Sequence, residues 1–135
     1  RVGFATERLA LAEQRLERTP GDPAAMRAKI DAMVVLRQFD ALRNWVEPLL
    51  ADDAAVSEDA RRVATLGRSH WLAGKGDFAA AREAAQLYVA DEPTDLEALL
   101  FLLDLVGRSR GDVVGVARGV AAAAPDAWEP KVALA

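Results

Sequence analysis

The residues Gly74-Lys75-Gly76-Asp77-Phe78 open a segment that runs to Pro93 as G-K-G-D-F-A-A-A-R-E-A-A-Q-L-Y-V-A-D-E-P. Gly76 can adopt the left-handed backbone conformation that ends a helix, because it has no Cβ to clash. Asp77 can cap the following helix by accepting a hydrogen bond from its free N–H groups. Pro93 disfavours the helical region for the residue before it. The segment therefore predicts a helix over residues 77–90 between two corners.

The apolar residues of this predicted helix recur every three or four positions, which places them on one face: Phe78, Ala81, Ala85, and Tyr88 or Val89. Small side chains at Ala81 and Ala85 allow a neighbouring helix to approach closely, so a larger residue at Ala81 is expected to overpack that contact. Thr94 followed by Glu97 forms a capping-box pattern, which predicts that the next helix begins at Thr94.

This unit resembles the second half of a tetratricopeptide repeat. The resemblance rests on the corner, the small residue, the apolar pair and the closing proline: Gly76-Asp77-Phe78, Ala81, Ala85, Tyr88 and Pro93. The preceding helix supplies the first half, with Ser69 and Leu72 near the expected packing sites. It departs from the pattern at Thr65 and Arg68, and the match is best over about 62–95. The resemblance implies an all-α fold, a right-handed α-α superhelix in which helix pairs stack.

The same reading extends along the chain at intervals near the ~34 residues of a tetratricopeptide repeat. Phe39, Phe78 and Val113 mark comparable corners. We expect about seven helices in one domain over residues 1–135, and a three- or four-helix bundle is the competing fold. The expected parts are a half-repeat at 1–20, repeats at about 22–53, 57–94 and 95–125, and a truncated helix at 126–135.

Composition and charge argue against nucleic-acid-binding and membrane-spanning classes of protein. The 135 residues are 52% apolar and 28% charged, with a net charge of −4 and no Cys. Dispersed basic residues argue against nucleic-acid binding, and no apolar run reaches the ~18 residues of a membrane span. The chain begins with Arg1, from which we expect a fragment or a processed product. Its Ala- and Arg-rich composition suggests a bacterial source, and the absence of Cys is compatible with either the cytoplasm or the periplasm.

Catalytic chemistry is not indicated. His70 is the only His, and the chain has no Cys, so zinc or triad chemistry lacks the further residues it needs. The carboxylate pairs Asp52-Asp53 and Glu58-Asp59 lie at expected helix starts, where capping explains them. We expect no catalytic residues, no cofactor and no metal. Trp45, Trp71 and Trp128 are expected in core or inter-repeat packing more than in binding.

The resemblance implies that the first helix of each repeat lines a concave groove that binds a protein or peptide partner. Carried onto this sequence, the groove residues are Arg27, Asp31, Val34, Leu66, His70, Ala73, Phe101, Asp104 and Arg108. They lack the Lys, Asn and Arg cluster with which some tetratricopeptide proteins hold a chaperone's terminal carboxylate, so that role is not assigned.

The leading hypothesis is a non-catalytic protein-interaction scaffold, a segment of a larger bacterial repeat protein. The style of the repeats resembles the periplasmic arms of exopolysaccharide export proteins. This resemblance implies recruitment of partners to secretion machinery and slightly favours the periplasm over the cytoplasm. The alternative is an oligomerisation or regulatory helical module of an enzyme or a transcription regulator. In that case the apolar ends of the helical array would associate with one another.

Overall fold

The computed structural model describes residues 2–109 and 118–122, and every regular element there is a helix. A short helix at 118–122 follows six longer ones, which brings the described helices to seven. The longer ones are α1 (Val2–Arg18), α2 (Pro23–Val35), α3 (Phe39–Leu49), α4 (Glu58–Gly74), α5 (Phe78–Asp91) and α6 (Leu96–Arg108). The all-α class and the helix number are as predicted. None of the described helices combines the length and apolarity needed to cross a membrane.

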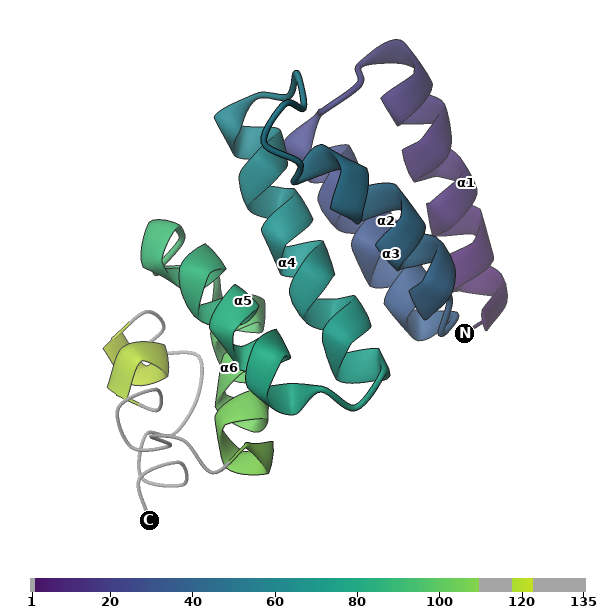
Figure 1. Cartoon of the computed structure of the whole chain (residues 1–135). Helices are drawn as coiled ribbons and strands as arrows, with labels where there is room; N and C mark the ends of the chain where they lie inside the picture. Colours follow the sequence, from purple (N-terminus) through teal and green to yellow (C-terminus); the bar gives the residue numbers. More distant parts are fainter. Residues whose placement is uncertain (1, 110–117, 123–135) are drawn as a thin grey trace.

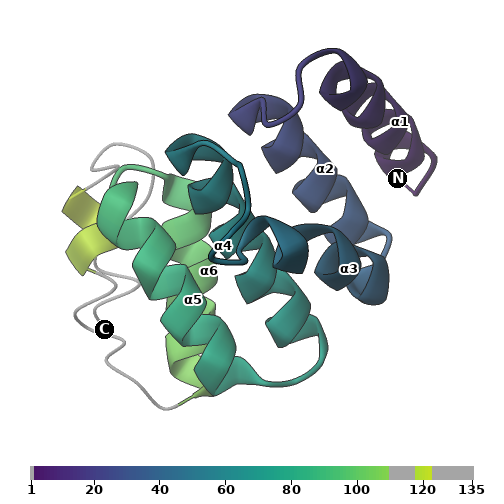
Figure 2. The ribbon, with the colours of Figure 1, turned by 45° about the horizontal axis from the view of Figure 1, so that its top comes forward.

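The helices are laid out in chain order, with α1 at one end and α5 and α6 at the other (Figures 1 and 2). Each of the six packs against the next, and α2 also packs against α4. The buried residues therefore form successive clusters between neighbouring helices. One core cluster includes Met26, Leu42 and Ala64 from α2, α3 and α4, and another includes Ala85 and Leu102 from α5 and α6. The contact between α2 and α4 places these two helices side by side.

Helix starts follow the capping chemistry of the sequence. The side chains of Asp22, Ser57 and Asp77 each accept a hydrogen bond from a backbone N–H of the first turn of α2, α4 and α5. The capping box at Thr94 was a wrong prediction. Asp95 accepts from the Ala98 N–H at 3.1 Å and caps α6, one residue later than expected. Asp caps at least as well as Thr, so it takes the role when both are adjacent.

Two corners of the array have the same backbone geometry. Arg37 follows α2 with a φ of 57°, and Gly76 follows α4 with a φ of 88°. Each donates its N–H to a carbonyl three residues back, Val34 for Arg37 and Ala73 for Gly76. The sequence predicted both corners, but the one at Arg37 was less clearly marked because it has no glycine. A side chain in this left-handed region costs roughly 1 kcal/mol, so Arg37 occupies a place that suits glycine.

Two glycines of α4 are contact points with neighbouring segments. A Cβ on Gly67 would lie 2.8 Å from Val46 Cγ1 on α3 and 3.3 Å from Ile30 Cδ1 on α2. A Cβ on Gly74 would lie 2.5 Å from the Phe39 ring. The missing side chains let α2 and α3 approach α4 closely. They also seat Phe39 against the C-terminal end of α4.

Some predicted features fall on residues whose structure is not described. These are the corner at Val113, most of the later part of the repeat expected at about 95–125, the helix at 126–135, and Trp128. Within the described part, Pro48 lies inside α3, which ends one residue later, and Trp45 and Trp71 pack half-buried against the first core cluster.

Candidate interaction groove

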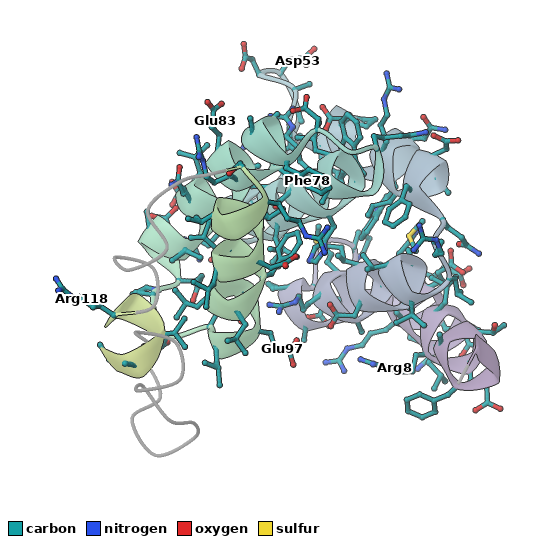
Figure 3. All side chains as sticks on the ribbon, turned by 90° about the horizontal axis from the view of Figure 1, so that it is seen from below. Arg8, Asp53, Phe78, Glu83, Glu97 and Arg118 are labelled. Atoms are coloured by element: carbon teal, nitrogen blue, oxygen red, sulfur yellow. The ribbon has the colours of Figure 1, made fainter. Side chains whose placement is uncertain are left out.

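An open groove of about 480 Å³ runs along the C-terminal ends of α2, α4 and α6. Six of the nine residues predicted to line a groove meet there: Val34, His70, Ala73, Phe101, Asp104 and Arg108. They come from three helices that are far apart in sequence, and the packing of α2 beside α4 brings the first two helices together. Figure 3 views the molecule from below, with Phe78 near one end of α6 and Glu97 near the other. We call this feature the α2–α4–α6 groove.

The floor of the groove contains a stacked pair of rings. The ring centroids of His70 on α4 and Phe101 on α6 lie 4.0 Å apart, and the ring planes are inclined by 11°. Burial lowers the pKa of His70 to about 4, and the nearby positive charge of Arg27 adds to the effect. His70 is therefore neutral at pH 7, and each of the two stacked rings covers one face of the other.

Two arginines flank this floor, each over an aromatic ring. The Arg108 guanidinium lies 5.3 Å from the Phe78 ring centroid, and its Nε donates to Asp104 Oδ2 at 2.9 Å. The Arg37 guanidinium lies 5.6 Å from the Phe39 ring centroid. No carboxylate of residues 2–109 or 118–122 forms an ion pair with Arg37. Asp104 offsets Arg108, so the charged residues that line the groove leave one positive charge unmatched.

Arg27 and Asp31 lie on the same helix as Val34 but outside the groove. Arg27 Nη1 donates to Asp95 Oδ2 at 2.5 Å, and its Nη2 donates to Glu97 at 3.3 Å. Its Nε lies 3.5 Å from Asp31 Oδ1. The Tyr88 hydroxyl donates to the same Asp95 oxygen at 2.6 Å. These two predicted partner-binding residues therefore interact with other side chains of the same chain. We call this group the Arg27 cluster; its members are Arg27, Asp31, Tyr88, Asp95 and Glu97.

The Arg27 cluster perturbs the acidity of its members. Burial raises the pKa of Asp95, but hydrogen bonds from Arg27 and Tyr88 outweigh it, and the net pKa is lowered. Burial raises the pKa of Asp31, against the attraction of Arg27. Asp95 is thus stabilised as a carboxylate, which strengthens its bond to Arg27 at neutral pH.

Leu66 was a wrong prediction for the groove. Its side chain is 0% exposed and packs with Tyr88 and Ala98 in a core cluster. The residue lies on α4, which has α2, α3 and α5 as neighbours, so its surface is covered on several sides. Helical spacing placed Leu66 one turn before His70, but spacing alone does not show how far a neighbouring helix extends over that face.

Sequence reasoning missed five groove residues: Arg37, Phe39, Gly74, Phe78 and Leu105. All but Leu105 belong to the corners after α2 and α4, whereas the prediction considered only helix faces. One signal was available. Aligning the two corners on Phe39 and Phe78 places Arg37 opposite Gly76, where a large cation replaces the residue that the turn favours.

A second polar cluster explains a departure from the tetratricopeptide pattern. Arg68 Nη2 lies 2.7 Å from Glu47 Oε1, and Trp71 Nε1 donates to Glu47 Oε2 at 2.9 Å. The hydrogen bond from Arg68 lowers the pKa of Glu47, with Trp71 contributing in the same direction. Arg68 thus ties α4 to α3 instead of packing as an apolar residue. Within the described ranges, no group of three acidic or imidazole side chains is arranged to hold a metal ion.

Two of the other cavities lie away from the groove. An apolar one of about 370 Å³ is bounded by Leu16, Trp45, Leu49 and Val56, between α1, α3 and the linker before α4. A polar one of about 360 Å³ lies beside Arg27 and Arg62, where carboxylates already pair with both guanidinium groups. Neither combines an apolar floor with an unmatched charge.

No protein-family model, no curated protein and no solved structure matches this chain. The geometry and chemistry of the groove are therefore the basis for a functional assignment.

Proposed function

We propose that the protein is a non-catalytic protein-interaction scaffold and that the α2–α4–α6 groove accepts a peptide segment of its partner. The main support is the groove itself, in which rings and arginines from separate helices surround one open volume. Its size falls in the range of roughly 300–1,000 Å³ typical of ligand pockets. Aromatic residues and Arg are the types enriched where binding energy concentrates at interfaces.

The proposal includes a tetratricopeptide-like superhelix. In this reading α2, α4 and α6 are the first helices of successive repeats, and α3 and α5 are second helices. The packing of α2 on α4 and the two equivalent corners support it. The narrower version, a scaffold of bacterial exopolysaccharide or secretion machinery in the periplasm, rests on the resemblance in sequence style.

Affinity capture with matched variants tests the groove assignment. Arg108→Glu reverses an exposed charge on the groove wall, whereas Glu83→Arg reverses an exposed charge on α5 outside the groove. We expect partners recovered by the parent chain to be lost with Arg108→Glu and kept with Glu83→Arg, at equal helicity by circular dichroism. Equal recovery with all three proteins would remove the groove assignment.

Self-association is the second candidate function, favoured by apolar side chains exposed at both ends of the described array. Phe4 and Leu11 on α1 are 66% and 64% exposed, and Leu87 on α5 is 66% exposed. Exposed apolar ends of a helical array can stack on one another. Light scattering over a concentration series separates the two functions. A monomer at all concentrations would exclude the oligomerisation module.

A further inference from the structure

The backbone at Arg37 is the starting observation. Arg37 has a φ of 57° in a corner whose equivalent, after α4, is formed by Gly76 with a φ of 88°. No other non-glycine residue in the described ranges has a positive φ. The position after a helix favours glycine because a Cβ is strained there. An arginine at this site therefore lowers the stability of the chain relative to glycine.

Contacts within the fold do not account for the side chain. Arg37 is exposed, its closest aromatic contact is the Phe39 ring at 5.6 Å, and it forms no ion pair with the described residues. An exposed cation–π contact of this length is weak. Residues in sparsely populated backbone conformations concentrate at functional sites, where another role outweighs the strain. Arg37 also lines the α2–α4–α6 groove.

The surroundings of Arg37 specify the chemistry of an occupant. Arg108 is matched by Asp104, so Arg37 provides the unmatched positive charge of the groove in a chain whose net charge is −4. The stacked rings of His70 and Phe101 line the same groove and add an uncharged aromatic surface to it. A carboxylate beside a flat apolar side chain would complement both features.

We infer that Arg37 is a partner-contacting residue and that the groove takes an acidic peptide segment with an aromatic side chain next to its carboxylates. The aromatic group lies on the His70–Phe101 floor, and a carboxylate accepts hydrogen bonds from the Arg37 guanidinium. This inference rests on the proposed function and adds the chemical class of the partner. It also explains why the strained arginine is present at this corner.

The test uses the whole chain and a fluorescein-labelled dodecapeptide with a central Trp flanked by Glu, compared with the same peptide carrying Lys at each Glu. Fluorescence anisotropy measures the affinity, and thermal unfolding measures Tm. We expect the Glu peptide to bind and the Lys peptide to bind at least about tenfold more weakly. Arg37→Gly should weaken binding of the Glu peptide about tenfold while raising Tm by about 2–5 °C. Arg37→Lys should keep part of the affinity.

Arg43→Gln, which removes an exposed arginine of α3 outside the groove, is the matched charge control and should leave binding within about twofold. Equal binding of the two peptides, no binding of either, or Arg37→Gly that binds like the parent chain would each overturn the inference. Binding of phosphatidylserine vesicles that depends on Arg37, in place of peptide, would overturn it too. The capture experiment with Arg108→Glu tests the proposed function separately, since it does not depend on the class of peptide.

Discussion

Arg27 on α2 and Asp95, the capping residue of α6, are joined by a hydrogen-bonded ion pair of 2.5 Å across 68 positions of sequence. Tyr88 on α5 donates to the same carboxylate oxygen. The pair bypasses α3 and α4 and connects two parts of the array that are not adjacent in sequence. It restrains the separation of α2 and α6, which are also walls of the groove.

Removing either partner of this pair should destabilise the chain. Both side chains are mostly buried, at 22% and 17% exposed, so the remaining charge would be poorly solvated. We expect Arg27→Ala and Asp95→Asn each to lower the free energy of unfolding by about 2 kcal/mol. Asn keeps the capping oxygen, so the second variant tests the charge and not the cap. Urea unfolding of both variants and the double variant should give a coupling of about 1 kcal/mol. Additive effects would mean that the pair does not hold α2 to α6.

Two glycine substitutions should have opposite signs. Gly67→Ala places a methyl group 2.8 Å from Val46 Cγ1, and we expect a loss of about 1–3 kcal/mol from overpacking between α3 and α4. In α6, the matched control Gly107→Ala meets no atom within 4 Å. It should gain about 0.5–1 kcal/mol from helix propensity. Chemical denaturation measures both, and equal effects at the two sites would contradict the close approach at Gly67.

Substitutions at the two corners should change stability in opposite directions. Gly76→Ala adds a Cβ that meets nothing within 4 Å, so its cost is that of the left-handed backbone, about 1 kcal/mol. Arg37→Gly relieves the same strain and should gain a similar amount. Thermal unfolding of the two variants checks the signs. A stabilising Gly76→Ala would show that the two corners are not under the same constraint.

Acid should destabilise the fold partly through His70. Its pKa is about 4 in the folded state, against about 6.5 in the unfolded chain. Between these values the unfolded state binds more protons, so stability falls as pH decreases from about 6.5 to 4. We expect His70 to account for about 2 kcal/mol of that fall. His70→Gln does not titrate, so its unfolding free energy should decline less over the same window. Parallel declines would contradict the burial of a neutral His70 against Phe101.

The helices could be predicted from the sequence because their caps depend on nearby residues. Which predicted groove residues remain available to a partner depends on long-range contacts. Caps at Asp22, Ser57 and Asp77 depend on neighbours within three residues, so their patterns were sufficient. Val34, His70 and Phe101 were assigned to a groove by the resemblance to a tetratricopeptide repeat, and in the structure all three line one groove.

The predicted groove residues that lie outside the groove are held there by contacts with later helices, which the spacing of residues along one helix does not reveal. Arg27 is occupied because α6 begins within reach of it, and Leu66 is covered by Tyr88 and Ala98 from later helices. Aligning the sequence on Phe39 and Phe78 places Arg37 opposite Gly76, but the positive φ of Arg37 is seen only in the structure.

Hydrogen–deuterium exchange with and without the Glu-flanked Trp peptide tests the central claim most directly, because it reports where the chain is covered. Binding in the α2–α4–α6 groove predicts slower exchange at the C-terminal ends of α2, α4 and α6 and at the corners after α2 and α4. The parts of α3 beyond Phe39 and of α5 beyond Phe78, which do not line the groove, should be unchanged. Protection centred on α3, on α1, or on the apolar cavity beside Trp45, with the groove unaffected, would contradict it.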